Sequence, residues 1–318
     1  MKAVYLEEGA VNKNDISLSP ITGLIETRVF RNTTEADKYE HIGDAEVVFT
    51  NKVIFDEETF QRCPNLKYLG VCATGYNVID LEAAGRHGVT VTNVPAYSTE
   101  SVTQLAWGFI LECAGRLQLH NTSVHNGDWT RSDTFCYWLA PVMELAGKTL
   151  GIVGYGNIGR RVAEVADAFH MEVLVHTAHP DKYSENEPER QFVSMNELFK
   201  RSDIITLHCP LTEETDKLIS ESNISKMKDG VIIINVSRGG LVEEQALTAA
   251  LQSGKVAAAA VDVISEEPMK PENPLLHAPN LVITPHMAWA SVESRKRLIQ
   301  VVADNFRAYL EGKSLNVL

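Results

Sequence analysis

Short runs of apolar residues alternate with amphipathic stretches along most of this chain. In the first hundred residues, runs that predict buried strands lie at 2–6, 46–50, 66–71 and 89–93. Helical patterns separate some of these runs, at 56–63 and 81–87. The alternation resumes further on, with apolar runs at 150–153, 173–175, 203–208, 231–235, 256–263 and 281–286. Strands that alternate with helices are typical of parallel sheets, so the pattern predicts two α/β units.

Two longer amphipathic stretches, 102–119 and 291–310, predict the longest helices of the chain. Asp56 is a plausible N-cap for the helix at 56–63. Two polar segments interrupt the pattern. Residues 7–20 are expected to be irregular, and the tryptophan-bearing segment 120–139 is expected to be a connecting loop.

Three glycines follow the apolar run at 150–153 with the spacing G-x-G-x-x-G: Gly154, Gly156 and Gly159. A helical pattern and a further strand come next, which is the context that a dinucleotide fingerprint requires. Gly154 would permit the tight turn, Gly156 would let the backbone approach a pyrophosphate, and Gly159 would let the helix pack closely on the strand. The alternative is a glycine turn without a ligand, which the strand-turn-helix-strand order disfavours.

The strand after this helix does not end in the acid that usually binds the adenosine ribose 2′-OH. Thr177 stands in its place, and the nearest positive groups are His176, His179 and Lys182. An acid would repel a 2′-phosphate, whereas threonine carries no charge. We therefore expect NADP(H) to be accepted, and the preference between NAD and NADP stays open.

Three later strands are each followed by one conspicuous polar side chain: Arg238, Glu267 and His286. Taken singly, these could be a surface arginine, a solvated loop acid and a structural histidine. Because the carboxyl ends of parallel strands face a ligand crevice, their convergence indicates an enzyme. The loop 72–80 also follows a strand and contains Gly75, although it could be a plain turn.

The composition narrows the choice of partners. The 318 residues carry a net charge of −13, which argues against nucleic acid and anionic membranes as partners. No apolar run is long enough to span a membrane, and the first residues do not resemble a signal peptide. The five cysteines form no C-x-x-C pair, so we expect neither a metal site nor a disulfide framework, and a cytoplasmic location.

Taken together, the motifs resemble the NAD(P)-dependent D-2-hydroxy-acid dehydrogenases over nearly the whole chain. They are the loop 73–77, the fingerprint 154–159, His208-Cys-Pro-Leu-Thr212, Asn235-Val-Ser-Arg-Gly-Gly-Leu-Val242, Asp262-Val-x-x-x-Glu-Pro268 and Thr284-Pro-His286. The segment 284–295 and the ending Asn-Val-Leu318 are most similar to the glycerate dehydrogenase (hydroxypyruvate reductase) branch.

This resemblance implies two doubly wound parallel-sheet domains. A Rossmann NAD(P)-binding domain would comprise residues 100–287, and a flavodoxin-like substrate domain would comprise residues 1–99 and 288–318. The helices 102–119 and 291–310 would cross between the domains, with the active site in the cleft. The resemblance also implies a homodimer, with the 102–119 helix as its interface.

The resemblance further implies roles for individual residues. Arg238 would bind the substrate carboxylate, together with backbone N–H groups of Ala73, Thr74 and Gly75. His286 would give a proton to the carbonyl oxygen of a keto acid, and Glu267 would pair with His286 and favour its imidazolium form. Further cofactor contacts would come from Gly154, Tyr155, Gly156, Asn157, Ile158, Gly159, Thr177, Cys209, Pro210, Thr215, Val236, Ser237 and Asp262.

Two of these assignments have structural alternatives. Asp262 would lie near the nicotinamide carboxamide, or it could be a strand-end acid without a ligand. Trp289 would line the substrate pocket and favour small hydroxy acids, or it could pack in the core between the domains.

The expected function is that of a hydroxypyruvate or glyoxylate reductase. Alternatives within the same family are a non-catalytic nucleotide-sensing protein and a dehydrogenase for another acid, such as phosphoglycerate or D-lactate. A formate-type enzyme is disfavoured because that branch has glutamine where this chain has Glu267. A methyltransferase with a glycine-rich turn would give Arg238, Glu267 and His286 no role.

Overall fold

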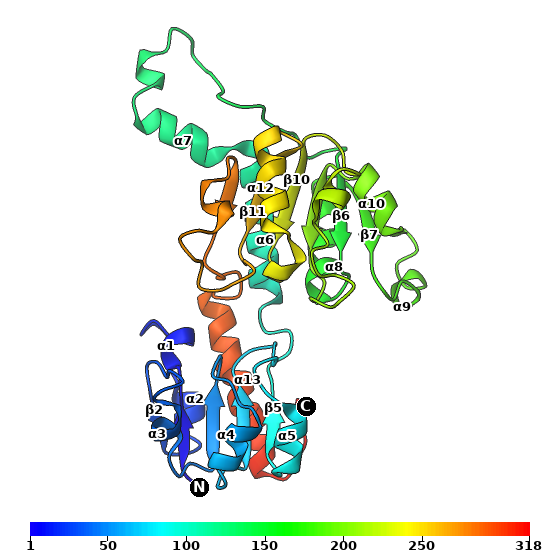
Figure 1. Cartoon of the computed structure of the whole chain (residues 1–318). Helices are drawn as coiled ribbons and strands as arrows, with labels where there is room; N and C mark the ends of the chain where they lie inside the picture. Colours follow the sequence, from blue (N-terminus) through cyan, green and yellow to red (C-terminus); the bar gives the residue numbers. More distant parts are fainter. The chain divides into compact units, whose positions relative to one another are not determined.

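The computed structural model describes all 318 residues and contains two compact units (Figure 1). Unit 1 comprises residues 1–98 and 289–318, and unit 2 comprises residues 99–288. Each unit is built on one sheet in which every strand pair is parallel. The expected fold class is therefore confirmed.

The sheet of unit 1 has the flavodoxin-like order β2-β1-β3-β4-β5. Its strands are β1 (Ala3–Tyr5), β2 (Thr27–Val29), β3 (Val47–Thr50), β4 (Tyr68–Val71) and β5 (Thr90–Thr92). The strand order reverses between β1 and β3, so the switch point of this sheet lies between their carboxyl ends.

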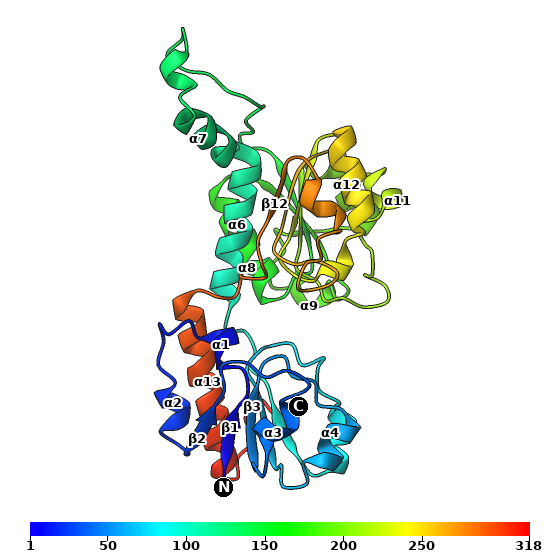
Figure 2. The ribbon, with the colours of Figure 1, turned by 60° about the vertical axis from the view of Figure 1, so that its left-hand side comes forward.

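Helices cover both faces of this sheet (Figure 2). On one face, Leu298, Val302 and Phe306 of α13 (Val292–Leu310) pack on the strands, and the centroids of the Phe306 and Phe49 rings are 5.6 Å apart. The opposite core receives side chains from α3 (Lys38–Ile42), α4 (Glu57–Arg62) and α5 (Leu81–Arg86). Short helices α1 (Glu8–Val11) and α2 (Ser19–Thr22) follow β1.

Side-chain caps begin several helices. Asp56 accepts a hydrogen bond from Thr59 N at 2.9 Å and so begins α4, as the sequence predicts.

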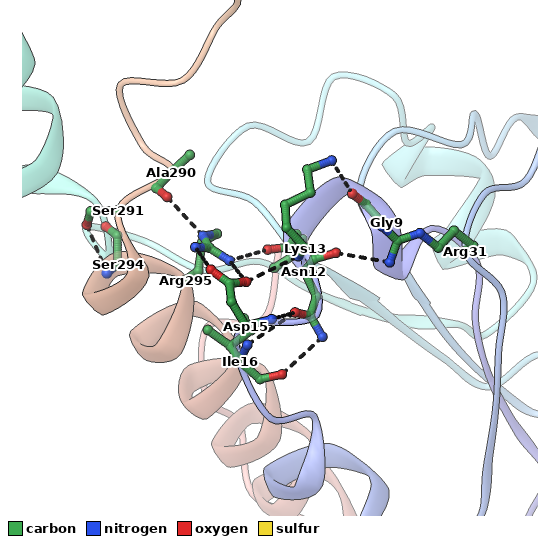
Figure 3. Close-up of polar contacts among 11 residues, drawn as sticks. Gly9, Asn12, Lys13, Asp15, Ile16, Arg31, Ala290, Ser291, Ser294 and Arg295 are labelled. Atoms are coloured by element: carbon green, nitrogen blue, oxygen red, sulfur yellow. Dashed lines mark hydrogen bonds and ion pairs between the residues drawn. The ribbon is translucent and has the colours of Figure 1, made fainter.

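A buried arginine at the start of α13 holds the loop that follows α1 (Figure 3). Arg295 is 7% exposed and donates two hydrogen bonds to Asp15, at 2.7 and 2.6 Å. It also donates to the carbonyls of Val11 (3.2 Å) and Ala290 (2.9 Å). The hydrogen bonds from Arg295 to Asp15 lower the pKa of Asp15 to about 2, so the pair stays charged in all but strong acid.

The sheet of unit 2 has the order β12-β11-β10-β9-β6-β7-β8, which is the Rossmann arrangement. Its strands are β6 (Thr149–Val153), β7 (Glu172–His176), β8 (Gln191–Phe192), β9 (Ile204–Leu207), β10 (Val231–Asn235), β11 (Val256–Val261) and β12 (Leu281–Ile283). The order reverses between β6 and β9, which places the switch point beside the glycine fingerprint.

Helices also lie on both faces of this second sheet. The helices α6 (Thr99–Gly115) and α8 (Asn157–Ala168) pack against each other beside the strands. A core cluster combines Leu198 of α10 and Leu251 of α12 with Ile233 of β10. The remaining helices are α7 (Leu117–His125), α9 (Asp181–Ser184), α10 (Met195–Arg201), α11 (Glu221–Ile224), α12 (Glu244–Ser253), η1 (Trp129–Arg131), η2 (Gly239–Leu241) and η3 (Pro274–His277). No helix in the structure is both long and apolar enough to cross a membrane.

The structure corrects two parts of the predicted pattern. The helix expected at 102–119 is two helices, because Arg116 adopts a left-handed conformation (φ 53°) between α6 and α7. As a result, α7 occupies the first part of the segment 120–139 that was expected to be a loop. The segment 7–20 was expected to be irregular, yet it contains α1 and begins α2, which are too short to show a periodic pattern.

Candidate active site

The glycine fingerprint forms a tight turn at the switch point of unit 2. Gly154 has φ 94°, and a Cβ atom there would lie 2.5 Å from the backbone nitrogen of Cys209. A Cβ at Gly159 would lie 2.1 Å from the carbonyl oxygen of Gly154. By contrast, a Cβ at Gly156 would meet nothing within 4 Å. Two glycines are thus required by packing, and the third leaves open space beside the backbone.

This turn fits a dinucleotide pyrophosphate. The helix α8 begins at Asn157, and the N–H groups of Asn157, Ile158 and Gly159 donate to no group of the chain. Free N–H groups and the positive end of the helix dipole favour an anion at this position. These residues can therefore hold the phosphates without a basic side chain.

Tyr155 can contribute to this site only through its backbone, because its side chain is buried. The phenol donates a hydrogen bond to Glu187 at 2.5 Å, and its ring packs edge-on against Tyr183 and Phe192. Glu187 also pairs with Arg160 of α8 at 2.9 Å. The loop between β7 and β8 is thereby tied to the fingerprint itself.

Thr177 directly follows β7, where the acid of the usual fingerprint would stand. It is half-buried, and its hydroxyl accepts a hydrogen bond from His179 N at 3.4 Å. This position therefore offers a ribose a hydroxyl group and no negative charge.

The ends of β9 and β10 are joined by short polar contacts. Ser237 donates to the carbonyl of Cys209 at 2.6 Å. The fully buried Asn235 accepts from Ser237 N at 3.0 Å and donates to the carbonyl of Arg238 at 2.8 Å. Asn235 thus fixes the turn that presents Arg238. This role was not predicted, although Asn235 is the first residue of the motif 235–242.

The remaining predicted cofactor contacts lie in the same two loops. Thr215 donates to the carbonyl of Pro210 at 2.8 Å and accepts from Thr212 N at 2.7 Å, which closes the loop after β9. Val236 is buried. The Cys209 thiol is also buried, and burial raises its pKa to about 11, so the thiol is neutral near pH 7.

His208, the residue before Cys209, is also uncharged near neutral pH. Its Nδ1 is shielded from solvent without a hydrogen-bond partner, and its Nε2 lies 2.9 Å from the hydroxyl of Thr206. Burial lowers the pKa of His208 to about 3. The side chains of His208 and Cys209 are therefore not ionised near neutral pH, so a phosphate bound beside them would depend on backbone dipoles.

Arg238 is exposed at the end of β10, and its guanidinium donates to the carbonyl of Ser237 at 2.8 Å. The next residue, Gly239, lies against the loop that follows β11. A Cβ on Gly239 would be 1.9 Å from the carbonyl carbon of Ile264. The backbone that carries Arg238 therefore packs directly on the loop that carries Glu267.

Glu267 and His286 form the pair that the family resemblance implies. The carboxylate oxygen Oε2 of Glu267 lies 2.6 Å from Nδ1 of His286, and both side chains are about one-third exposed. His286 has a left-handed backbone (φ 52°), which is uncommon for a residue with a side chain. Such a conformation persists only where the surroundings hold it.

Asp262 supplies much of that support. Its carboxylate is 1% exposed and accepts hydrogen bonds from Met287 N (2.8 Å), Ala288 N (2.7 Å) and the hydroxyl of Thr284. Its backbone carbonyl accepts from His286 N at 2.7 Å. Asp262 therefore shapes the turn that presents His286, a role that the sequence analysis did not assign to it.

Unit 1 presents a different kind of loop after β4. Ala73, Thr74 and Gly75 are half-buried or exposed, and their N–H groups donate to no group of the chain. The side chain of Asn93, directly after β5, donates to the carbonyl of Thr74 at 2.8 Å and so anchors the loop. Three successive open N–H groups can bind a carboxylate.

Trp289 is half-buried in unit 1. Its ring packs edge-on against Tyr97, with centroids 6.4 Å apart, and lies against the core cluster under α13. The ring of Trp289 thus packs within unit 1, and a contact with substrate stays a prediction.

Comparison with known proteins agrees with this fold. Residues 107–288 match the family model described as "D-isomer specific 2-hydroxyacid dehydrogenase, NAD binding domain". The chain is 46% identical to a hydroxypyruvate reductase of Blautia hydrogenotrophica, over 100% of this chain and 99% of that protein. It is 38% identical to a glycerate dehydrogenase of Methylorubrum extorquens, over 90% of this chain and 89% of that protein.

A solved structure of an acyclic imino acid reductase in complex with NADPH and D-Arg is also similar. It matches with a TM-score of 0.86 at 27% identity, over the whole of both chains. The chain therefore belongs to the D-isomer specific 2-hydroxyacid dehydrogenase family. It is an NAD(P)-dependent oxidoreductase of that family.

Proposed function

We propose that this protein reduces hydroxypyruvate or glyoxylate at C2 with NAD(P)H and, in reverse, oxidises the corresponding D-2-hydroxy acid. The observation that carries the proposal is the Glu267–His286 pair, held on the same sheet edge as the glycine fingerprint and the Arg238 turn. The 46% identical relative is a hydroxypyruvate reductase, which supports this choice of substrate.

The substrate carboxylate is bound by two kinds of donor. Arg238 offers a planar, permanently charged guanidinium that suits a carboxylate, and its exposure in unit 2 leaves it accessible. The open N–H groups of residues 73–75 in unit 1 offer neutral donors to the same carboxylate. In this proposal, unit 1 is the substrate domain and unit 2 is the nucleotide domain.

His286 moves the proton of the reaction. Glu267 engages Nδ1, so Nε2 is the nitrogen that exchanges a proton with the substrate oxygen. Glu267 orients the ring through Nδ1, and the protonated ring is the form that acts as an acid during reduction. Bound NAD(P)H supplies the hydride to C2. Asp262 keeps the histidine in place, and its contact with the nicotinamide carboxamide is also part of this proposal.

NADPH is accepted alongside NADH. Thr177 presents no negative charge to a 2′-phosphate, and the solved acyclic imino acid reductase is a complex with NADPH. A preference for NADH above about a hundredfold in kcat/KM, nearly 3 kcal/mol, would refute this part of the proposal.

The protein acts as a homodimer in the cytoplasm. After α6, the chain forms an arm, residues 117–145, that extends from the sheet of unit 2 (Figures 1 and 2). More than half of the side-chain surface is exposed on Leu117, Trp129, Phe135, Trp138, Leu139 and Val142. Together they expose on the order of 700 Å², close to what one partner buries in a standard interface. This arm, with α6, is the surface that a second copy covers. The cytoplasmic location is supported by the five cysteines, which are all free thiols, as expected in a reducing compartment.

A panel of 2-keto acids assayed with both reduced cofactors tests the proposal. We expect steady oxidation of NADH and NADPH with hydroxypyruvate and glyoxylate, and weaker activity with pyruvate or phosphohydroxypyruvate. No turnover with any keto acid, combined with tight NAD(P)H binding, would favour a nucleotide-sensing protein.

Light scattering of the intact protein and of the variant Phe135→Asp tests the dimer. The ring of Phe135 is 88% exposed, and a charge in its place should prevent association and give monomers.

A further inference from the structure

Unit 1 contains a buried acid that the proposed reaction does not use. Glu7 follows β1, one residue beyond Leu6, whose N–H still pairs with the carbonyl of Phe49 in β3. Glu7 therefore stands at the switch point of this sheet, between the carboxyl ends of β1 and β3. In open parallel sheets, ligands usually bind in the crevice at this point.

The carboxylate of Glu7 fills that place itself. Oε1 accepts hydrogen bonds from Lys52 N (2.7 Å) and Val53 N (2.8 Å). Oε2 accepts from the hydroxyl of Thr50 (2.8 Å) and from Asn51 N (3.1 Å). The residue is 5% exposed, and no lysine, arginine or histidine forms an ion pair with it. Four neutral donors thus satisfy one buried anion.

In the loop after the neighbouring strand, β4, no carboxylate of the chain accepts from the backbone N–H groups of residues 73–75. The strands β3 and β4 are paired in register, with Thr50 opposite Val71. The N–H groups of 51–53 are occupied by Glu7, whereas those of 73–75 donate to no group of the chain. Two adjacent strand-end loops could hold a carboxylate, and one already contains a carboxylate of the protein.

The loop 51–53 also orients the first peptide group of the loop 73–75. Asn51, whose N–H is held by Glu7, donates from its side chain to the carbonyl of Cys72 at 2.7 Å. The carbonyl of Cys72 and the N–H of Ala73 belong to one planar peptide unit and point in opposite directions. By holding that carbonyl, Asn51 fixes the direction in which the Ala73 N–H points.

We propose that Glu7 is a positioning residue for substrate binding. Its carboxylate occupies the anion site at the switch point of unit 1, which leaves residues 73–75 as the open site for the substrate carboxylate. Through Asn51 it also aims the N–H of Ala73 at that carboxylate. The identity of the bound carboxylate as a 2-keto acid rests on the proposed function, whereas the occupation of the switch point does not.

Chemical rescue of Glu7→Ala tests this role. The truncation removes the terminal CH2 and carboxylate of the side chain, and acetate can refill the vacated space with its own carboxylate. We expect KM for hydroxypyruvate to rise about tenfold or more, because buried hydrogen bonds to a charged group are lost. The KM for NADH should be unchanged, and acetate should lower the raised KM towards the wild-type value.

Glu8→Ala is the matched control. Glu8 is the next acid in the chain and is also largely buried, but its carboxylate pairs with Arg31 at 3.4 Å and contacts neither loop. This variant should keep the wild-type KM, and acetate should not improve it or the wild-type protein. Asn51→Ala should raise KM as Glu7→Ala does, and acetate should not rescue it because the link to Cys72 is missing.

A second measurement does not depend on turnover. Acetate should raise the melting temperature of Glu7→Ala more than those of the wild type and Glu8→Ala, since only Glu7→Ala has a vacated carboxylate site in addition to the open site at 73–75. If Glu7→Ala does not fold, Glu7→Gln replaces it, because the amide sets an NH2 group against the donors of Thr50 and Asn51. A folded Glu7 variant with wild-type KM, or the lack of any acetate effect on Glu7→Ala, would overturn the inference. If the wild type reduces no keto acid, the proposed function fails, and the melting measurement still decides the role of Glu7.

Discussion

Both units use a buried carboxylate to shape a loop at the carboxyl edge of a sheet. In unit 1, Glu7 holds residues 51–53 and, through Asn51, the loop 73–75. In unit 2, Asp262 holds residues 284–288. The two carboxylates are saturated by backbone N–H and hydroxyl groups, and neither forms an ion pair.

The two loops differ in what they present. The loop of unit 2 carries the side chain of His286, which can exchange a proton, whereas the loop of unit 1 presents only backbone N–H groups, which can bind but cannot react. In the proposed reaction, a buried carboxylate therefore serves chemistry in one unit and binding in the other. Damage to unit 2 should lower kcat, and damage to unit 1 should raise KM.

The largest effect is expected from His286→Gln. Removing the proton donor should lower kcat by about a hundredfold to ten-thousandfold, while the Kd for NADH stays near the wild-type value. Steady-state kinetics and fluorescence titration with NADH measure the two quantities. His277→Gln, at an exposed histidine of η3, is the matched control and should behave as wild type. Wild-type kcat in His286→Gln would mean that another group donates the proton.

Asp262→Asn tests whether the buried carboxylate of Asp262 positions His286. The substitution keeps the shape but sets an NH2 group against N–H donors, which should loosen the His286 turn and lower kcat about tenfold to a hundredfold. Asp203→Asn is the control, because Asp203 lies at the amino end of β9 and accepts from Thr149 N at 2.9 Å. If instead the KM for NADH rises and kcat does not change, Asp262 acts mainly on the cofactor.

Mild acid should destabilise unit 2 more than unit 1. Burial lowers the pKa of His208 in unit 2 from near 6.5 to about 3, so below pH 6.5 the unfolded chain binds a proton that the folded chain does not. The free energy of unfolding should therefore fall by up to about 1.4 kcal/mol per pH unit, or about 2 kcal/mol between pH 6.5 and 5. In unit 1, Arg295 lowers the pKa of Asp15 to about 2, so that stabilisation is lost only below pH 4.

Urea unfolding at pH 7.5 and pH 5 measures this difference. The transition of unit 2 should move to lower urea at pH 5, and His208→Gln should remove most of that shift. An equal shift in His208→Gln would assign the acid sensitivity to other groups.

The smallest effect is expected from Thr177→Asp, which restores the acid at the end of β7. The new charge should repel a 2′-phosphate and shift the ratio of kcat/KM values from NADPH towards NADH by about tenfold. Thr177→Ser keeps the hydroxyl without a charge and serves as the control. An unchanged ratio in Thr177→Asp would place the 2′-phosphate away from residue 177.

The parts of the fold that could be predicted are those with local signals. The apolar runs predict most strands of both sheets, and the glycine spacing predicts the turn at Gly154, because a Cβ there would clash with the next strand end. The Glu267–His286 pair was also predicted, although only through a resemblance to a family. Each of these features depends on residues whose type is restricted by backbone geometry or by chemistry.

The parts that could not be predicted depend on contacts between distant residues. Glu7 reads as an ordinary acid after a strand, and its importance appears only when β1 lies beside β3. The break at Arg116 was missed because an arginine carries no signal for a left-handed backbone. The edge strand β2 was missed because it has three residues, none of them buried.

Transfer of deuterium from NADH labelled at both C4 positions tests the central claim most directly. After reaction with hydroxypyruvate, the account predicts glycerate of the D configuration with deuterium at C2, detected by NMR and chiral chromatography. Glycerate without deuterium at C2, glycerate of the L configuration, or no glycerate at all would contradict it.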